Sequence, residues 1–213
     1  MKYRIASILF CLLISSCTNT IEDKPSLFKA GDILFQDLDC GGPCDAIEQV
    51  TEGVDGWDFS HCGIVVEKES KLLVIEAYGA VQALPIDSFL LRYVDSNRNP
   101  KVVIGRPKDN ALATKSAELA FSYLGKGYDD IFQLNDDKYY CSELVYECFK
   151  AANNNQEYFP LNIMTFKAPN TDSTMSEWTK YYQEIGKPIP EGEMGINPGA
   201  ISRSEELEII YLN

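Results

Sequence analysis

The chain has 213 residues and a formal net charge of −13 at pH 7, with 45% hydrophobic and 24% charged residues. This length and apolar content suffice for one domain with a buried core, and no internal repeat or low-complexity tract indicates a second. The acidic excess argues against nucleic acid and anionic lipid headgroups as partners, because both repel a negative surface.

The N-terminus has the features of a secretory signal. Lys2 and Arg4 precede an apolar run over 5–14 that is too short to span a bilayer as a helix. Small residues then lead directly into Cys17, a pattern that resembles the lipobox of bacterial lipoproteins. The resemblance implies that residues 1–16 are removed as a signal and that Cys17 carries a lipid. That lipid would anchor the protein to a membrane of the bacterial cell envelope, facing the periplasm or the exterior. The alternatives are an ordinary cleaved signal and an uncut anchor.

Residues 17–27 are polar and are expected to form a tether, so the folded domain should span 28–213. Apolar residues in this domain alternate at a period of two in some segments and recur at helical spacing in others. The tail beyond 153 is rich in Pro, Gly and Asn, and we expect ordered loops there that build a binding site or lid. The pattern indicates an α+β fold, with an antiparallel sheet and helices to one side. In chain order it predicts a strand at 31–38, a helix at 44–53, a hairpin and a third strand (from about Ala80) over 60–86, a helix at 85–94, a strand at 100–107, helices at 110–127, 141–149 and 177–184, and a strand at 207–212.

Beyond the signal and Cys17 there are five cysteines, an odd number that leaves at least one thiol free. Cys40 and Cys44 are four residues apart, and an exported location permits disulfides, so we expect a local bridge between them. No metal or other cofactor is expected, because Cys-x3-Cys followed by an adjacent His-Cys pair is not a usual zinc spacing. The side chains weighed for such a site are Cys40, Cys44, His61 and Cys62.

His61 is the only histidine, and Glu76 interrupts the apolar face of a predicted strand. A tight hairpin with its tip between Lys68 and Glu69 would place His61 directly opposite Glu76 on one face of the sheet. A carboxylate there is costly to bury unless it has a partner. The simpler interpretation is that Glu76 lies at an exposed edge and that His61 is an ordinary half-buried residue. The functional one is that Glu76 orients the imidazole, as the third member of a catalytic triad does.

Two cysteines, Cys141 and Cys148, share the apolar face of one predicted helix in "DKYYCSELVYECF". Helical spacing alone does not separate a buried filler from a nucleophile. Cys141 falls at the helix N-terminus, where unpaired N–H groups and the positive end of the dipole stabilise a thiolate. Its own N–H could also contribute to an oxyanion hole. Cys148 lies two turns further in and has neither advantage, so Cys141 is the candidate nucleophile.

Five segments of the chain carry a family resemblance: "GDILFQ", "FSHCGIVVE", "LLVIEAYGAVQ", "YYCSELVYECF" and "MTFKAPNTDS…PIPEGEMGINPGAISRS". Together they resemble the permuted papain-like amidases of the YiiX/YebB type. This family is a circularly permuted relative of the NlpC-type cell-wall peptidases and of the lecithin:retinol acyltransferase group. The resemblance implies a papain-like fold in which His61 is the base, Glu76 orients it and Cys141 is the nucleophile, with histidine before cysteine in the chain. Cys62 departs from the family, in which a small apolar residue is frequent; it could pair with Cys40 or Cys44, or simply pack. The segment "CGGPC" is a second departure.

The expected activity is that of a thiol amidase or peptidase with a Cys-His-Glu triad and a covalent thioester intermediate. Short cell-wall peptides are the first substrate class expected, because the resemblance points to amide bonds and an envelope lipoprotein lies beside peptidoglycan. The alternatives are an acyl hydrolase or acyltransferase on lipids or N-acyl amides, which should show an apolar groove beside Cys141, and an inactive binding lipoprotein. The oligomeric state is left open. The expected groove walls carry Tyr128, Tyr140, Thr165 and Phe166.

Overall fold

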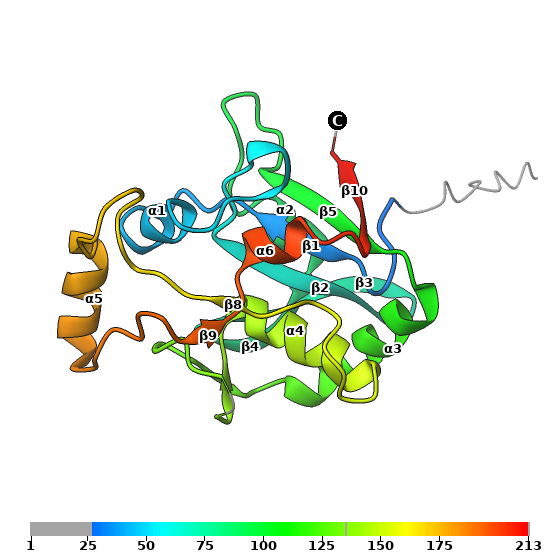
Figure 1. Ribbon diagram of the computed structural model, residues 1–213. Helices are drawn as coiled ribbons and strands as arrows, with labels where there is room; N and C mark the ends of the chain where they lie inside the picture. Colours follow the sequence, from blue (N-terminus) through cyan, green and yellow to red (C-terminus); the bar gives the residue numbers. More distant parts are fainter. Residues whose placement is uncertain (1–26, 135, 213) are drawn as a thin grey trace, which may run out of the picture.

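The computed structural model describes residues 27–134 and 136–212, so the expected signal, Cys17 and nearly all of the tether lie outside the described residues. An eight-stranded sheet occupies the centre, in the order β10-β5-β1-β2-β3-β4-β6-β7 (Figure 1). Neighbouring strands are antiparallel except the short parallel pair β6–β7. The strands of this sheet are β1 (Ile33–Gln36), β2 (His61–Lys68), β3 (Lys71–Tyr78), β4 (Ala80–Pro85), β5 (Val102–Pro107), β6 (Gly127–Tyr128), β7 (Lys138–Tyr139) and β10 (Leu207–Tyr211).

Helices cover both faces of the sheet. The buried side chains of α3 and α4 pack on one face, and α2 packs on the other through Phe89. The prediction of an α+β fold built on an antiparallel sheet is confirmed, but the expectation that all helices lie to one side is wrong because of α2. The helices are α1 (Pro43–Glu48), α2 (Ile86–Leu90), α3 (Asn110–Ala120), α4 (Cys141–Ala152), α5 (Ser176–Ile185) and α6 (Pro198–Ser202), with 3₁₀ turns η1 (Val54–Gly56) and η2 (Phe121–Tyr123).

The segment after α4 crosses the molecule from the side of α3 to the opposite end, where α5 lies (Figure 1). It runs outward to α5 and returns through β9 and α6 before β10 joins the sheet edge (Figure 1). On the way β8 (Asn162–Ile163) pairs with β9 (Met194–Gly195), and α5 packs against α1 around Trp178. The helix predicted at 177–184 is confirmed, whereas β8, β9 and α6 are too short to show a period in the sequence.

The β2–β3 hairpin sets the positions of His61 and Glu76. Its two-residue loop consists of Glu69 and Ser70, both with positive φ (52° and 60°), as a type I′ turn requires. Lys68 pairs with Lys71, and Glu76 pairs with Gly63. The predicted register is therefore wrong by two residues, because the turn lies one residue later than expected. A shift of two leaves every side chain on the same face, so His61 lies diagonal to Glu76 rather than opposite it.

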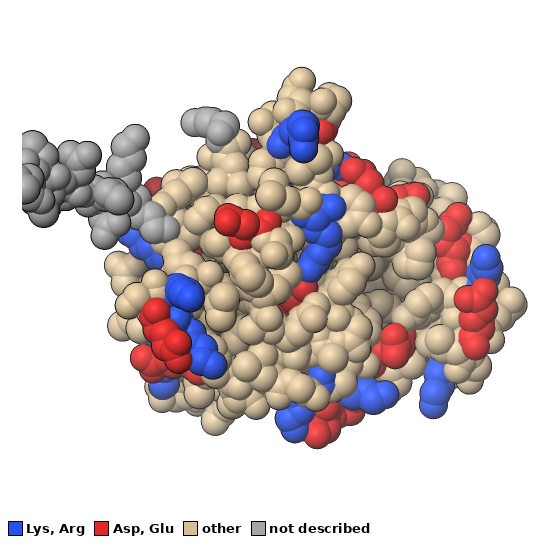
Figure 2. Space-filling model, turned by 180° about the vertical axis from the view of Figure 1, so that it is seen from behind, with Lys and Arg blue, Asp and Glu red and all other residues tan. Residues whose placement is uncertain are grey.

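Charged side chains of both signs are scattered over the face seen in Figure 2, without a continuous basic area on that face. Over residues 27–134 and 136–212, no helix has the length and apolar content needed to cross a bilayer.

Candidate functional site

The His61 imidazole and the Glu76 carboxylate meet on one face of the β2–β3 hairpin. His61 Nε2 lies 2.7 Å from Glu76 Oε2, and the two side chains are 4% and 0% exposed. Strand β3 lies between β2 and β4, so the alternative of an exposed edge position for Glu76 is wrong. Burial alone would lower the pKa of His61, but hydrogen bonds with Cys141 and Glu76 outweigh burial and raise this pKa to about 9. The imidazole is therefore held in its protonated form at neutral pH.

Glu76 also accepts hydrogen bonds from Arg92 and Gln82. Arg92 Nη1 lies 2.9 Å from Oε2 and Nη2 lies 2.5 Å from Oε1, while Gln82 Nε2 lies 3.1 Å from Oε1. Burial would raise the pKa of Glu76, but His61 and Arg92 outweigh burial and lower this pKa to about 2. The sequence analysis missed Arg92. The sequence indicates a partner for Glu76 only indirectly, because a buried carboxylate needs a compensating charge. It does not indicate which of several arginines and lysines supplies that charge.

Cys141 is the first residue of α4 and is 6% exposed. Tyr140 before it has extended backbone angles, so the N–H of Cys141 is among the first of the helix and has no intrahelical acceptor. The Cys141 thiol lies close enough to Cys62 and His61 for both to act on its pKa. Cys62 has the largest effect, and against burial it lowers this pKa, together with His61, well below the ordinary value. The arrangement is that of a thiolate–imidazolium pair.

The two other free cysteines, Cys62 and Cys148, are buried, and the pKa of each thiol is raised rather than lowered. Cys148 is 0% exposed, two turns into α4, and burial raises the pKa of its thiol. Cys62 follows His61 in β2, and burial together with its contact to Cys141 raises the pKa of the Cys62 thiol. Cys62 therefore keeps its proton and can donate it to the Cys141 sulfur. Cys40 and Cys44 form a disulfide with a Cα–Cα distance of 5.6 Å, the bridge that their spacing predicts.

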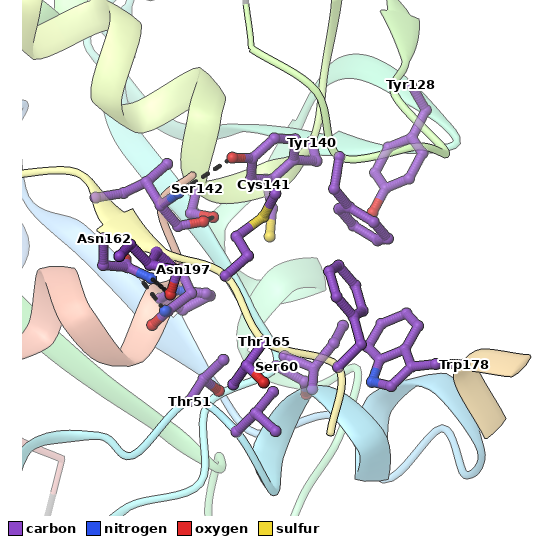
Figure 3. Close-up of a pocket in the computed structure, with 18 residues that line it drawn as sticks. Thr51, Ser60, Tyr128, Tyr140, Cys141, Ser142, Asn162, Thr165, Trp178 and Asn197 are labelled. Atoms are coloured by element: carbon purple, nitrogen blue, oxygen red, sulfur yellow. Dashed lines mark hydrogen bonds between the residues drawn. The ribbon is translucent and has the colours of Figure 1, made fainter. Parts of the chain in front are cut away.

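A groove that is open to solvent lies beside Cys141, which is one of its lining residues. Figure 3 shows Cys141 and Tyr140 on one side of it and Thr165, Ser60 and Thr51 on the other. Its walls come from α1 and the segment after it, from the loop before α4, from α5 and from the tail around β8 and β9. Apart from the Cys141 thiolate, none of the 18 lining residues is charged.

All four residues expected in the groove walls line this groove. Tyr128 and Tyr140 come from the loop before α4, and Thr165 and Phe166 follow β8. The sequence analysis missed the contribution of α1 and α5. The remaining lining residues are Ile47, Val50, Thr51, Ser60, Phe132, Cys141, Ser142, Asn162, Ile163, Met164, Trp178, Ile196, Asn197 and Pro198.

Three comparisons place the chain among known proteins. A family model described as "permuted papain-like amidase enzyme, YaeF/YiiX, C92 family" matches residues 28–211. The chain is 29% identical over 187 residues to the uncharacterized protein YiiX of Escherichia coli K12, covering 85% of each protein. It also resembles a crystal structure from Escherichia coli O157:H7 described as that of the metalloprotein yiiX. The TM-score is 0.70 at 28% identity, over 87% of this chain and 97% of that one.

Proposed function

The chain belongs to the permuted papain-like amidase family, and we propose that it hydrolyses amide bonds through a thioester on Cys141. The observation that carries the proposal is the buried His61–Glu76 pair beside the Cys141 thiol, whose pKa is lowered. Cys141 is also the first residue of α4 and lines the groove. In this assignment Cys141 is the nucleophile, His61 the acid and base, and Glu76 the residue that orients the imidazole.

The reaction has two halves. The Cys141 thiolate attacks the carbonyl carbon, and the oxyanion forms beside the first N–H groups of α4. His61 Nε2 is held by Glu76, which leaves Nδ1 to give its proton to the departing amine as the C–N bond breaks. The neutral imidazole then takes a proton from water, whose oxygen attacks the thioester, and the C–S bond breaks to restore the thiolate. The carboxylic acid leaves with the oxygen of that water.

The groove favours an apolar acyl group as part of the substrate. Apart from the Cys141 thiolate, which attacks the substrate, the lining has aromatic, aliphatic and neutral polar side chains. A carboxylate or ammonium group of a cell-wall peptide would therefore find no ionic partner along the rest of the groove. An acyl chain would instead bury apolar surface there. We therefore propose N-acyl amides with an apolar acyl part as the favoured substrate class, and short cell-wall peptides as the second candidate.

No step of the proposal uses a metal. Over the described residues, no group of three or more His, Cys, Asp or Glu side chains is arranged to hold one, and His61 Nε2 is already bonded to Glu76. The metal in the description of the related crystal structure stays a statement about that protein.

We further propose that residues 1–16 are a signal and that Cys17 carries a lipid, which would place the domain at the envelope membrane. Metabolic labelling with a fatty acid should mark the wild-type protein and not the Cys17→Ser variant. Equal labelling of both would exclude Cys17 as the attachment site.

The first test is the reactivity of the thiol itself. Iodoacetamide should alkylate Cys141 well below the pH at which an ordinary thiol reacts, and His61→Ala should abolish this selectivity. Cys148→Ala is the matched control, because it removes a buried thiol from the same helix and should leave the reaction at Cys141 unchanged. A Cys141 thiol that reacts as slowly as an ordinary cysteine would instead support a binding protein without catalysis.

The second test separates the substrates. Wild type and Cys141→Ala are compared on a long-chain N-acyl amino acid and on purified muropeptides. Release of the amino acid by wild type alone supports the acyl amide, whereas new amino termini from muropeptides support the cell-wall peptide. Turnover of neither, with a reactive thiol, would reject both substrate classes and retain only the nucleophile assignment.

A further inference from the structure

Arg92, which follows α2, extends the buried chain of charges that leads to Cys141. Its guanidinium contacts both oxygens of Glu76, and its side chain is 17% exposed. Two parallel N–H···O bonds fix the plane of a carboxylate as well as its position. Glu76 Oε2, which accepts from Arg92 Nη1, is the same oxygen that contacts His61 Nε2. The orientation of the carboxylate on which the imidazole rests is therefore set by Arg92.

The rings of Tyr78 and Phe89 each contact both the Arg92 guanidinium and the His61 imidazole. Arg92 Cζ lies 4.6 Å from the centre of the Tyr78 ring and 5.4 Å from that of the Phe89 ring. The same rings flank His61, with centre-to-centre distances of 5.7 Å and 5.8 Å. A guanidinium stacked on aromatic faces loses little freedom when it forms further hydrogen bonds. Arg92 and His61 are thus fixed on the two sides of Glu76.

We propose that Arg92 is a positioning residue of the reaction, which holds Glu76 ionised and oriented and thereby keeps the His61 imidazole turned toward Cys141. The inference rests on the proposed function of Cys141. Arg92 is not among the residues that line the groove, so its influence on the chemistry passes through the carboxylate.

The charges alternate along this chain: guanidinium, carboxylate, imidazolium, thiolate. Removing the guanidinium would leave one uncompensated negative charge in a buried site, which favours protonation of each remaining group. The pH range in which Cys141 reacts as a thiolate should then move upward, by about one pH unit. Three further titratable groups act on the thiolate, Cys62, Tyr128 and Tyr140, and burial raises the pKa of all three, so they stay neutral.

The experiment measures the rate of alkylation of Cys141 by iodoacetamide as a function of pH, with the modified peptide identified by mass spectrometry. Wild type is compared with Arg92→Met, Arg92→Lys, Glu76→Gln and the Arg92→Met/Glu76→Gln double variant. Arg98→Met is the matched control, because it removes the same charge from an exposed side chain in a neighbouring loop.

Arg92→Met should shift the profile upward by about one pH unit and lower its maximum, while Arg98→Met should do neither. Arg92→Lys keeps the charge but not the bidentate contact with Glu76. It should therefore leave the pH dependence of alkylation where it is and lower the maximal alkylation rate. With Glu76→Gln already present, removing Arg92 should change little, because the group through which it acts is gone.

The proposal is overturned if Arg92→Met follows the wild-type profile, or if it shifts the profile equally with and without Glu76. Should Arg92→Met fail to fold by circular dichroism, Arg92→Lys decides: a full wild-type rate would overturn the positioning role. A different failure, in which wild-type Cys141 is no more reactive than in His61→Ala, contradicts the proposed function rather than the role of Arg92.

Discussion

Replacing Glu143 by glutamine should stabilise the protein more at neutral pH than in acid. Glu143 lies in the first turn of α4, is 1% exposed, and accepts a hydrogen bond from the Tyr140 N–H at 3.4 Å. Burial is the main cause that raises the pKa of this carboxyl to about 9, and Asp129 has the largest effect among the charged groups that add to it. Glutamine has nearly the same shape and can keep the hydrogen bond to Tyr140, but it carries no proton to gain or lose.

The magnitude follows from linkage. In the folded protein Glu143 keeps its proton up to about pH 9, whereas in the unfolded chain it releases the proton near pH 4.5. The favourable contribution of this group is therefore complete below pH 4.5 and is lost as pH rises toward 9, at about 1.4 kcal/mol per pH unit. Between pH 4.5 and pH 7 the free energy of unfolding of Glu143→Gln should gain about 3 kcal/mol over that of wild type.

Urea unfolding at several pH values between these limits measures this difference, and the other titrating groups cancel because both proteins contain them. The control is Glu147→Gln on the next turn of α4, whose carboxylate pairs with Lys150 at 25% side-chain exposure. That variant should keep the pH trend of wild type. A stability difference between Glu143→Gln and wild type that is the same in acid and at neutral pH would refute a protonated Glu143.

Three further outcomes are expected. The rate of amide hydrolysis should decline above about pH 9, because the pKa of His61 is raised to about 9 and the imidazole then loses the proton that the leaving amine needs. A pH–rate profile measures this decline. Replacing Cys40 and Cys44 by serine should lower the free energy of unfolding by about 2 kcal/mol, the value for so short a ring, and added reductant should reproduce this effect in wild type. Gly31→Ala should lower Tm by several degrees, because a Cβ at this residue (φ 92°) would lie 2.5 Å from the Ala113 carbonyl oxygen, and an unchanged Tm would contradict the tight packing there.

The sequence predicted the half of the site that depends on local pairing. Strand alternation on either side of a short polar tip is enough to bring His61 and Glu76 to one face, and a register error of two preserved that result. The apolar runs in 31–38 and 100–107 likewise predicted β1 and β5, and the helical spacing of buried apolar side chains in 141–149 predicted α4.

What the sequence did not predict depends on contacts between distant segments. Arg92 lies near the end of the helix predicted at 85–94, and its position there does not indicate a function. Its role follows from its ion pair with the buried Glu76. The groove walls from α1 and α5 meet because the tail folds back across the molecule, and short elements such as β8 and α6 have no periodicity of their own. The effect of Cys62 on the pKa of Cys141 was not predicted either, because it requires α4 to be packed on the sheet.

The order of the site residues along the chain has a consequence for when Cys141 becomes reactive during folding. His61, Glu76 and Arg92 belong to one hairpin and the helix after it, contacts of short sequence separation that can form early in folding. Cys141 joins them only when α4 packs on the sheet, and it is Cys62 and His61 in that packed state that lower the pKa of its thiol. An incompletely folded chain therefore carries an ordinary, weakly nucleophilic cysteine. The reactivity of Cys141 therefore depends on the complete fold.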